Sequence, residues 1–201
     1  MYDWRQMTPR EREDLLACRK EEDYPWHSPP HFNLGFGTYH LSAACFEHVP
    51  VIGHSMQRMA GFQTSLLGFL KETEATVVAW CILPNHCHVI LDAENVRSTS
   101  RRLGQLHGRT SFEWNTEERK RGRQVWYRCT DRKIRSERHY WATMNYVLNN
   151  AVHHGYVDRW EDWPFSSAEA FLRSVGTEEA KRIWQEYPIL DYGKGWDDAG
   201  L

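Results

Sequence analysis

Two short apolar runs joined by a tight turn constrain the fold of this chain more than any other feature. Residues 76–83 read Thr-Val-Val-Ala-Trp-Cys-Ile-Leu, which is rich in the β-branched and apolar side chains that strands favour. Pro84 and Asn85 are turn residues, and residues 86–91, His-Cys-His-Val-Ile-Leu, return to a strand-like composition. The sequence therefore predicts two adjoining strands, with two histidines opening the second.

These histidines, His86 and His88, form an H-x-H pair. Side chains on a strand alternate faces with period 2, so both imidazoles point the same way, close enough to hold one metal ion. Cys87 points to the opposite face, and Asp92 lies too far along the strand to share the metal. A histidine pair on a strand is also compatible with a purely structural role, so a further partner is needed.

The remaining elements follow from apolar periodicity and from capping and turn residues. We expect a helix at 8–22 opened by a Thr8–Glu11 capping box, a strand at 38–46, a helix at 55–72 with core candidates Met56, Met59, Leu66, Leu67 and Leu70, a basic helix at 98–110, a partly helical segment at 112–122, a strand at 125–129, a helix at 135–154 ended by Gly155, and helices at 168–172 and 178–186. The order β-α-β-β-α-β predicts an α+β fold with a ferredoxin-like (split β-α-β) antiparallel sheet. We divide the chain into an N-terminal helix and Pro-rich extension (1–34), a core (35–157) and a C-terminal helical extension (158–201).

Composition excludes several classes of protein. No apolar stretch approaches the roughly 20 residues of a membrane span, and the first residues lack the order of a signal peptide. The five cysteines are scattered and never form C-x-x-C, which argues against a disulfide framework and a zinc ribbon. The chain has no G-x-x-x-x-G-K-[ST] loop. We expect a cytoplasmic protein with no membrane partner and no nucleotide cofactor.

The net charge of −2 conceals a strongly basic segment. Residues 97–138 hold 13 of the 25 Lys and Arg residues but only five of the 27 acidic ones, so this segment carries +8 and the rest of the chain −10. Phe112, Trp114, Trp126 and Tyr127 are interleaved with the cations. A charge run alone fits a solvated helix surface, and Trp126 and Tyr127 could equally be core residues. Cations with interleaved rings, however, favour single-stranded nucleic acid as the partner.

A second candidate site feature lies on the helix predicted at 135–154. Tyr146 and Asn150 are four residues apart, so they share a helix face about 6 Å apart along the axis. A tyrosine on an amphipathic helix is more often a core residue. Its conjunction with an H-x-H strand and a basic, aromatic segment is what draws attention to it.

These motifs together resemble the HUH single-tyrosine transposases, and most closely the REP-associated tyrosine transposases of bacteria. The resemblance rests on Ala-Trp-Cys-Ile-Leu-Pro-Asn-His-Cys-His at 79–88, Leu-His-Gly-Arg-Thr-Ser-Phe at 106–112, Trp-Tyr-Arg at 126–128, Asn-Tyr-Val-Leu-Asn-Asn at 145–150, His-Gly-Tyr-Val at 154–157, Trp-Pro-Phe-Ser-Ser at 163–167, Tyr-Gly-Lys-Gly-Trp-Asp at 192–197 and Pro-Trp-His-Ser-Pro-Pro-His at 25–31. It covers almost the whole chain.

The resemblance implies a role for each site residue. His86, His88 and Asn150 would bind a divalent metal, and Tyr146 would be the nucleophile, giving a 5′-phosphotyrosine link and a free 3′-hydroxyl. Two imidazoles and an amide oxygen carry no formal charge, which suits Mg²⁺ or Mn²⁺ completed by water and phosphate oxygens. The implied substrate is single-stranded or hairpin DNA of the REP type.

Cations of the basic segment are the candidates for phosphate contacts. They are Arg101, Arg102, Arg109, Arg121, Arg123, Arg128, Arg132 and Lys133. His153 and His154 are either spare ligands or polar groups at the end of the helix, and we favour the second interpretation. A monomer is slightly favoured over a homodimer, because the long extensions could replace a partner subunit.

The chain departs from the family pattern at three positions near the site. Cys87 replaces a larger hydrophobic residue, Ala151 stands where proline is common, and Leu148 stands where histidine is frequent. None of these changes removes a proposed ligand or the nucleophile. Three other functions stay open at this point: a non-catalytic module that binds single-stranded nucleic acid, a metal-dependent nuclease that uses water, and a structural protein with incidental histidines.

Overall fold

The computed structural model describes residues 8–11, 13, 14, 17, 36–190 and 192. By its contacts the chain divides into residues 1–34 and 35–201, and each unit is considered by itself. In the first unit, the Thr8 N–H and hydroxyl donate to Glu11 Oε2 at 2.7 and 2.8 Å, and the Glu11 N–H donates to Thr8 Oγ1 at 3.3 Å. This confirms the predicted capping box. Part of the expected helix at 8–22, and all of residues 25–31 and 193–197, lie outside the described residues.

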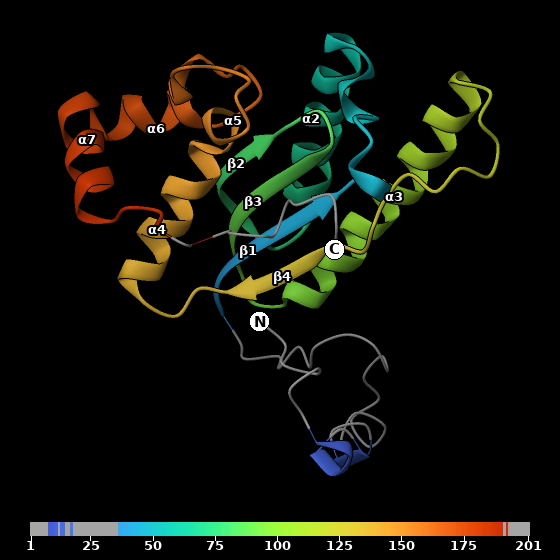
Figure 1. Cartoon of the computed structure of the whole chain (residues 1–201), viewed down its shortest axis with the longest axis horizontal. Coiled ribbons are helices and arrows are strands. Elements are labelled where there is room, and N and C mark those ends of the chain that lie inside the picture. The colour runs from blue at the N-terminus through green and yellow to red at the C-terminus, as the bar shows by residue number, and fades with distance from the viewer. Residues whose placement is uncertain (1–7, 12, 15–16, 18–35, 191, 193–201) are drawn as a thin grey trace. The chain divides into compact units, whose positions relative to one another are not determined.

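A four-stranded antiparallel sheet forms the centre of the second unit (Figure 1). Its strands are β1 (Gly37–Ala44), β2 (Thr76–Ile82), β3 (His86–Ala93) and β4 (Thr130–Lys133). The spatial order is β2-β3-β1-β4, and every neighbouring pair is antiparallel. With one helix after β1 and another after β3, this is the split β-α-β arrangement, so the ferredoxin-like prediction is confirmed.

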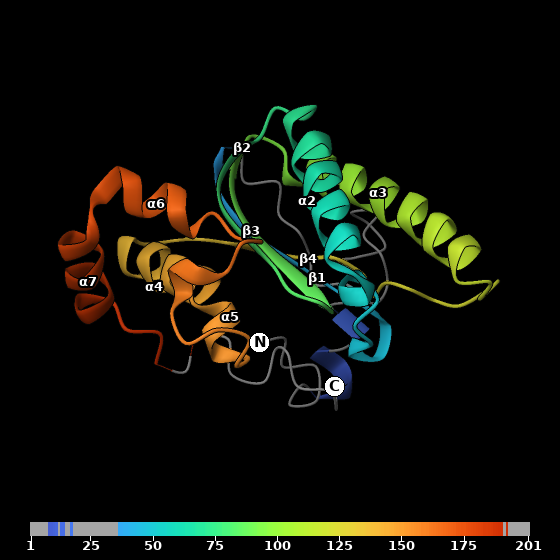
Figure 2. The same ribbon diagram turned by 90° about the horizontal axis from the view of Figure 1, so that it is seen from above.

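The two faces of the sheet are covered by different helices (Figure 2). Helices α2 (Met56–Lys71) and α3 (Val96–Glu117) cover one face, and α4 (Glu137–Leu148) covers the other. Alternate residues of the strands divide into two buried clusters accordingly. The face under α4 is the one that carries the candidate site.

Polar side chains begin the three long helices. Ser55 Oγ, Asn95 Oδ1 and Ser136 Oγ each accept a hydrogen bond from the backbone N–H three residues later, at 3.1, 3.1 and 3.2 Å. Such caps satisfy amide groups that have no partner within the helix. They fix where α4, the helix that carries Tyr146, begins above the sheet.

The predicted fourth strand at 125–129 was wrong in its position. Residue Trp126 forms only an isolated bridge to Cys45, and the strand proper is β4, four residues later in the chain. Val125 and Trp126 are buried, which explains the apolar pattern that suggested a strand. β4 reads Thr-Asp-Arg-Lys, and this polar edge strand gives no apolar signal.

The helix boundaries also differ from the prediction. α3 runs without a break through residues 110–112, and the Thr110 and Ser111 hydroxyls donate to carbonyls of the preceding turn within it. The helix expected at 135–154 is divided at Asn149 into α4 and the short α5 (Asn150–His153). Gly155 ends it as predicted, with φ +71°.

Further differences are small. β1 ends at Ala44, and the helical turn Phe46–His48 follows. Met56 is exposed and Leu67 is half-buried, so the prediction that these two are core residues was wrong. Met59, Leu66 and Leu70 are buried in the core, as predicted.

The chain beyond α5 packs back onto the core. It contains the turn Trp160–Asp162 and helices α6 (Ala168–Val175) and α7 (Thr177–Glu186), in place of the expected 168–172 and 178–186; another turn, Ile52–His54, precedes α2. The Trp163 indole donates to the Ile82 carbonyl at 2.9 Å, and the Ile82 N–H donates to the Phe165 carbonyl at 2.8 Å. Residues 163–167 therefore line the free edge of β2. None of the described helices is both long and apolar enough to cross a membrane.

Candidate active site

The two histidines of the H-x-H pair lie side by side on β3. His86 and His88 are buried, at 1% and 0% exposure, with ring centroids 5.0 Å apart. Cys87 lies in the core cluster on the opposite face, as strand geometry requires. Asp92 accepts a hydrogen bond from Thr38 Oγ1 at 2.5 Å near the other end of the strand.

Tyr146 and Asn150 lie directly above the histidines. The Tyr146 hydroxyl is 3.4 Å from His88 Nε2, and Asn150 Oδ1 is 2.9 Å from His86 Nε2. All four side chains are buried. The structure therefore brings together the four residues that the sequence singled out, from a strand and a helix that are 58 to 64 positions apart.

The neighbours of His86 indicate which of its two ring nitrogens carries the proton. Asn85 Nδ2 donates to the His48 carbonyl at 3.2 Å, so Asn85 Oδ1 is the atom that meets His86 Nδ1, at 2.8 Å. Oδ1 can only accept, so the His86 proton lies on Nδ1. In a neutral imidazole Nε2 then carries a lone pair. Two acceptors, His86 Nε2 and Asn150 Oδ1, thus face each other at 2.9 Å.

This arrangement fits a small divalent cation. Neighbouring donors in an octahedral shell with bonds of 2.0–2.1 Å lie about 2.9 Å apart, which is the spacing of these two atoms. Asn150 Nδ2 is buried and has no hydrogen-bond partner among the described residues. Without a cation, a rotated Asn150 amide would satisfy both that N–H and His86 Nε2. The Asn150 amide can therefore find a partner both with and without a bound cation.

Other histidines stand near this group. The His154 ring lies 4.9 Å from that of His86, at the end of α5, whereas His153 is exposed. Within the described parts of the chain, no three His, Cys, Asp or Glu side chains are placed to share a metal ion. The oxygen nearest His86 Nε2 among these side chains is that of the Asn150 amide, at 2.9 Å.

His40 is a site residue that sequence reasoning missed. It lies on β1, buried, with Nε2 3.1 Å from His88 Nδ1. The strand around it was predicted, but a strand prediction does not give its register. Only the pairing of Ser42 with His88 shows that His40 shares the face of the histidine pair.

Comparison with known proteins gives the family. No protein-family model matches the chain. A protein of Haemophilus influenzae that bears the provisional name REP-associated tyrosine transposase is 32% identical over 125 residues, which cover 56% of this chain and 68% of that protein. This chain belongs to the family of REP-associated tyrosine transposases. The predicted family is therefore confirmed, and with it the class of protein, an enzyme.

A solved structure shows the same fold. A REP-associated tyrosine transposase bound to a REP hairpin superposes on this chain with a TM-score of 0.57 at 19% identity, over 76% of this chain and 87% of the other. At this identity the match concerns the fold.

The cations predicted to bind DNA in this transposase family member differ in their surroundings. Arg102 contacts Glu72, Arg109 contacts Glu113 at 2.8 Å, and Arg123 contacts Glu118 at 2.8 Å. Arg101, Arg121 and Arg128 are exposed. Arg123 also donates to Asn115, so its guanidinium is part of a structural network.

The register of β4 separates the last two cations. Arg132 pairs with His40 and therefore projects to the face of the candidate site, whereas Lys133 pairs with Tyr39 on the opposite face. The Lys133 ammonium lies 5.7 Å from the Tyr39 ring centroid, which agrees with that assignment. Arg132 is the predicted phosphate contact that shares the face of Tyr146.

The aromatic residues of the basic segment differ in burial, and Phe112 is exposed. Trp126 is buried and stacks on His107 with centroids 4.2 Å apart, and burial lowers the pKa of His107 to about 4. Trp114 is buried too, whereas Tyr127 is half-buried against Phe46. The core interpretation of Trp126 therefore holds.

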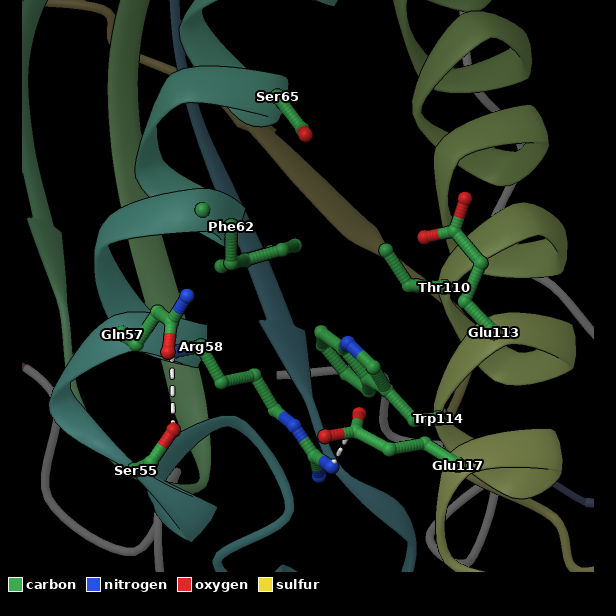
Figure 3. A pocket seen from close by; sticks show the side chains of 10 residues that line it. Ser55, Gln57, Arg58, Phe62, Ser65, Thr110, Glu113, Trp114 and Glu117 are labelled. Carbon is green, nitrogen blue, oxygen red and sulfur yellow. Dashed lines mark hydrogen bonds and ion pairs between the residues drawn. The ribbon is translucent and has the colours of Figure 1, made fainter.

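A pocket of about 340 Å³ lies between α2 and α3 (Figure 3), on the face of the sheet opposite to Tyr146 and the histidine pair. Arg58 and Trp114 form its floor, and Arg58 is held by Glu117 at 2.8 Å and by Glu118 at 2.5 Å. With its cation matched by two carboxylates, the pocket offers no net positive charge to a phosphate. It is part of the packing between the two helices.

Proposed function

We propose that this protein is a divalent-metal-dependent enzyme that cleaves and rejoins single-stranded DNA at REP-type hairpins through a covalent link to Tyr146. The observation that carries the proposal is the meeting of Tyr146 and Asn150 with His86 and His88 on one buried face. The REP hairpin bound by the solved family structure supports the choice of substrate. Arg132 on the same face supports a DNA strand running across it.

His86, His88 and Asn150 would hold the ion, either Mg²⁺ or Mn²⁺. When bound, it would offset the charge that develops on the scissile phosphate. The protein supplies orientation: Asn85 and His40 hold the outer ring nitrogens of the two histidines, and this keeps both Nε2 atoms toward the helix. Such second contacts reduce the freedom of the ligands before DNA arrives.

Tyr146 would carry the covalent step. Its phenolic oxygen bonds to the phosphorus while the bond from phosphorus to the 3′-oxygen breaks. The phenol loses its proton to solvent, and the departing 3′-oxygen gains one from solvent. One phosphodiester replaces another, so the reverse attack by a 3′-hydroxyl rejoins the strand without a nucleotide cofactor. Because a free phenol has a pKa near 10, the step depends on help from the site.

The decisive experiment is a denaturing gel with an end-labelled REP-type hairpin and Mn²⁺. We expect a labelled band at the mass of the protein for the wild type and its loss for Tyr146→Phe and His86→Ala. Cleavage that survives Tyr146→Phe but not His86→Ala would identify water as the nucleophile. If the wild type and both variants bind the hairpin and none of them cleaves it, the protein is a non-catalytic DNA-binding module.

A further inference from the structure

A second pair of side chains runs beside Tyr146 and Asn150. Asn145 and Asn149 are also four residues apart, and each directly precedes a residue of the candidate site. Asn149 Nδ2 donates to Asn145 Oδ1 at 2.9 Å and to the Asn145 carbonyl at 3.1 Å. Asn145 Nδ2 in turn donates to the carbonyl of Tyr187, the residue after α7, at 3.0 Å. We call Asn145 and Asn149 the asparagine pair.

Two backbone carbonyls fix which end of each amide points where. A carbonyl only accepts, so Asn145 turns Nδ2 toward the Tyr187 carbonyl, and its Oδ1 faces Asn149. For the same reason, Asn149 turns Nδ2 toward the Asn145 carbonyl. The two protons on Asn149 Nδ2 then serve both acceptors of Asn145. Donors and acceptors therefore match throughout the pair.

The asparagine pair spans the point at which the helix is divided. α4 ends at Leu148, Asn149 has φ −89° and ψ 5°, and α5 begins at Asn150. The Asn145 carbonyl accepts from the Asn149 backbone N–H at 2.9 Å as well as from its side chain. Side-chain bonds to the carbonyl four residues back offer the backbone an alternative to regular helix. Asn149 is therefore held by both its main chain and its side chain, directly before Asn150.

We propose that Asn145 and Asn149 are positioning residues that hold Asn150 against His86 and so set the metal affinity of the site. Asn150 is fully buried, and its Oδ1 lies 2.9 Å from His86 Nε2. A metal ligand has to be held within about 0.5 Å of its working position, so a small change at Asn149 would displace it. The metal role of Asn150 rests on the proposed function, but its placement beside His86 does not.

The pair also connects the site to the segment after α7. Asn145 is buried, and its partner carbonyl lies 42 positions further along the chain. A second contact lies nearby, because the Tyr192 hydroxyl is 2.7 Å from Thr143 Oγ1 and 3.5 Å from His40 Nδ1. The segment after α7 therefore contacts α4 at two residues within one turn of the candidate nucleophile.

The placement of Asn150 can be measured in metal-free protein by nuclear Overhauser contacts between its side-chain amide and the His86 ring. We expect this contact in the wild type and its loss in Asn149→Leu, which removes both side-chain bonds to Asn145. Asn149→Ser keeps a donor to the carbonyl four residues back, as Ser111 does on α3, and should retain a weaker contact. Ser111→Ala removes such a bond beneath the opposite face of the sheet and should change nothing.

Mn²⁺ binding, followed by electron paramagnetic resonance, measures the consequence. The dissociation constant should rise about 10-fold in Asn149→Leu, less in Asn149→Ser, and stay unchanged in Ser111→Ala. Tm should fall by no more than about 5 °C in each, so a loss of folding does not explain the change. In the Asn145→Leu background, Asn149→Leu should weaken binding less, because one of its two bonds is already absent.

An Asn150–His86 contact at full strength in Asn149→Leu, or an unchanged Mn²⁺ affinity in that variant, overturns the proposal. If Asn149→Leu does not fold, Asn149→Asp is judged by the same two readouts, since it keeps the shape but cannot donate to the carbonyl. A wild type that neither binds Mn²⁺ nor forms a covalent band from Tyr146 would reject the proposed function. The contact between Asn150 and His86 would still decide the placement.

Discussion

At the scale of single residues, successive side chains at the start of β3 point to opposite faces of the sheet, so two site residues flank a core residue. His86 and His88 face Tyr146 and Asn150, while Cys87 lies in the apolar cluster beneath α2 and α3. Burial holds the pKa of the Cys87 thiol well above its usual range, so this cysteine stays protonated. It is a core residue between two site residues.

This alternation predicts opposite results for neighbouring substitutions. Cys87→Val should change the free energy of unfolding by less than about 1.5 kcal/mol and keep the yield of covalent DNA adduct. His88→Val should fold but lose the adduct. Urea unfolding and the adduct gel check the pair. An adduct lost in Cys87→Val at full stability would mean that the thiol takes part in the site.

At the scale of elements, an ion cluster connects α2 to the end of α3. Glu118, whose side chain is 11% exposed, contacts Arg123 and Arg58. The hydrogen bond from Arg123, together with that from Arg58, lowers the pKa of Glu118 to about 2, against the opposing effect of burial. The lowered pKa means that Glu118 stabilises the fold as a carboxylate.

Acid should therefore remove this contribution in a defined range. Because the folded pKa lies below the unfolded value, the stabilisation is complete above about pH 4.5 and is lost as the pH falls toward 2. Glu118→Gln should lose about 3 kcal/mol at pH 7 and show a flatter decline of Tm over that acid range. Glu113→Gln, at an exposed ion pair, is the control and should change stability by less than about 1 kcal/mol. Equal losses in both variants would refute the assignment.

The turn that opens β3 depends on a glycine from a different element. A Cβ at Gly53 would lie 2.3 Å from Pro84 Cβ and 2.9 Å from its Cα, and the Gly53 N–H donates to the Pro84 carbonyl at 2.8 Å. Gly53→Ala should therefore lose about 1–3 kcal/mol and lower the adduct yield by displacing the turn before His86. Gly104→Ala, in open space on α3, should gain about 0.5–1 kcal/mol. Thermal unfolding of both variants measures the contrast.

The sequence predicted the elements whose signal is local. The hairpin around Pro84, the Thr8–Glu11 capping box, the helix end at Gly155 and the four-residue spacing of Tyr146 and Asn150 are all contained in short windows. β4 was misplaced because its edge position requires no apolar residues, and Val125 and Trp126 imitate a strand while packing in the core.

Features that depend on register or on distant contacts were beyond the sequence. His40 joins the site only through the pairing of β1 with β3, and Tyr192 only through the return of the chain after α7. The ion pairs of Arg102, Arg109 and Arg123 likewise needed the packed structure.

At the scale of the whole molecule, the segment after α5 forms part of the hydrophobic core. The Ser167 hydroxyl accepts from the Trp80 N–H at 2.9 Å, and Asn145 Nδ2 donates to the Tyr187 carbonyl at 3.0 Å. Ala168 is fully buried in the cluster that contains Tyr146.

Removing residues 158–201 should therefore destroy cooperative folding. It would leave the β2 edge and the α4 cluster uncovered, so we expect rapid proteolysis and no sharp thermal transition. Calorimetry and limited trypsin digestion test this, with deletion of residues 193–201 as the milder control. A truncated protein with a normal transition would show that residues 1–157 fold without the C-terminal segment.

Charge on the site face should govern DNA affinity across the molecule. Arg132→Gln should weaken hairpin binding uniformly across sequences and reduce the slope of log K against log salt by about 1. Arg109→Gln makes the same change of charge on α3, which covers the opposite face of the sheet, and should have a smaller effect. Fluorescence anisotropy over a salt series compares them. Equal slopes for the two variants would place the DNA elsewhere.

The two margins of the sheet have a consequence for how copies of this protein meet. Along β2, residues 165–167 already occupy backbone groups, through Ile82 and Trp80. Along β4, the sequence Thr-Asp-Arg-Lys presents one acidic and two basic side chains on a strand of four residues. Sheets of different molecules join edge to edge into fibrous aggregates when their edge strands are long and apolar. Crowded copies of this enzyme should therefore resist strand-by-strand polymerisation.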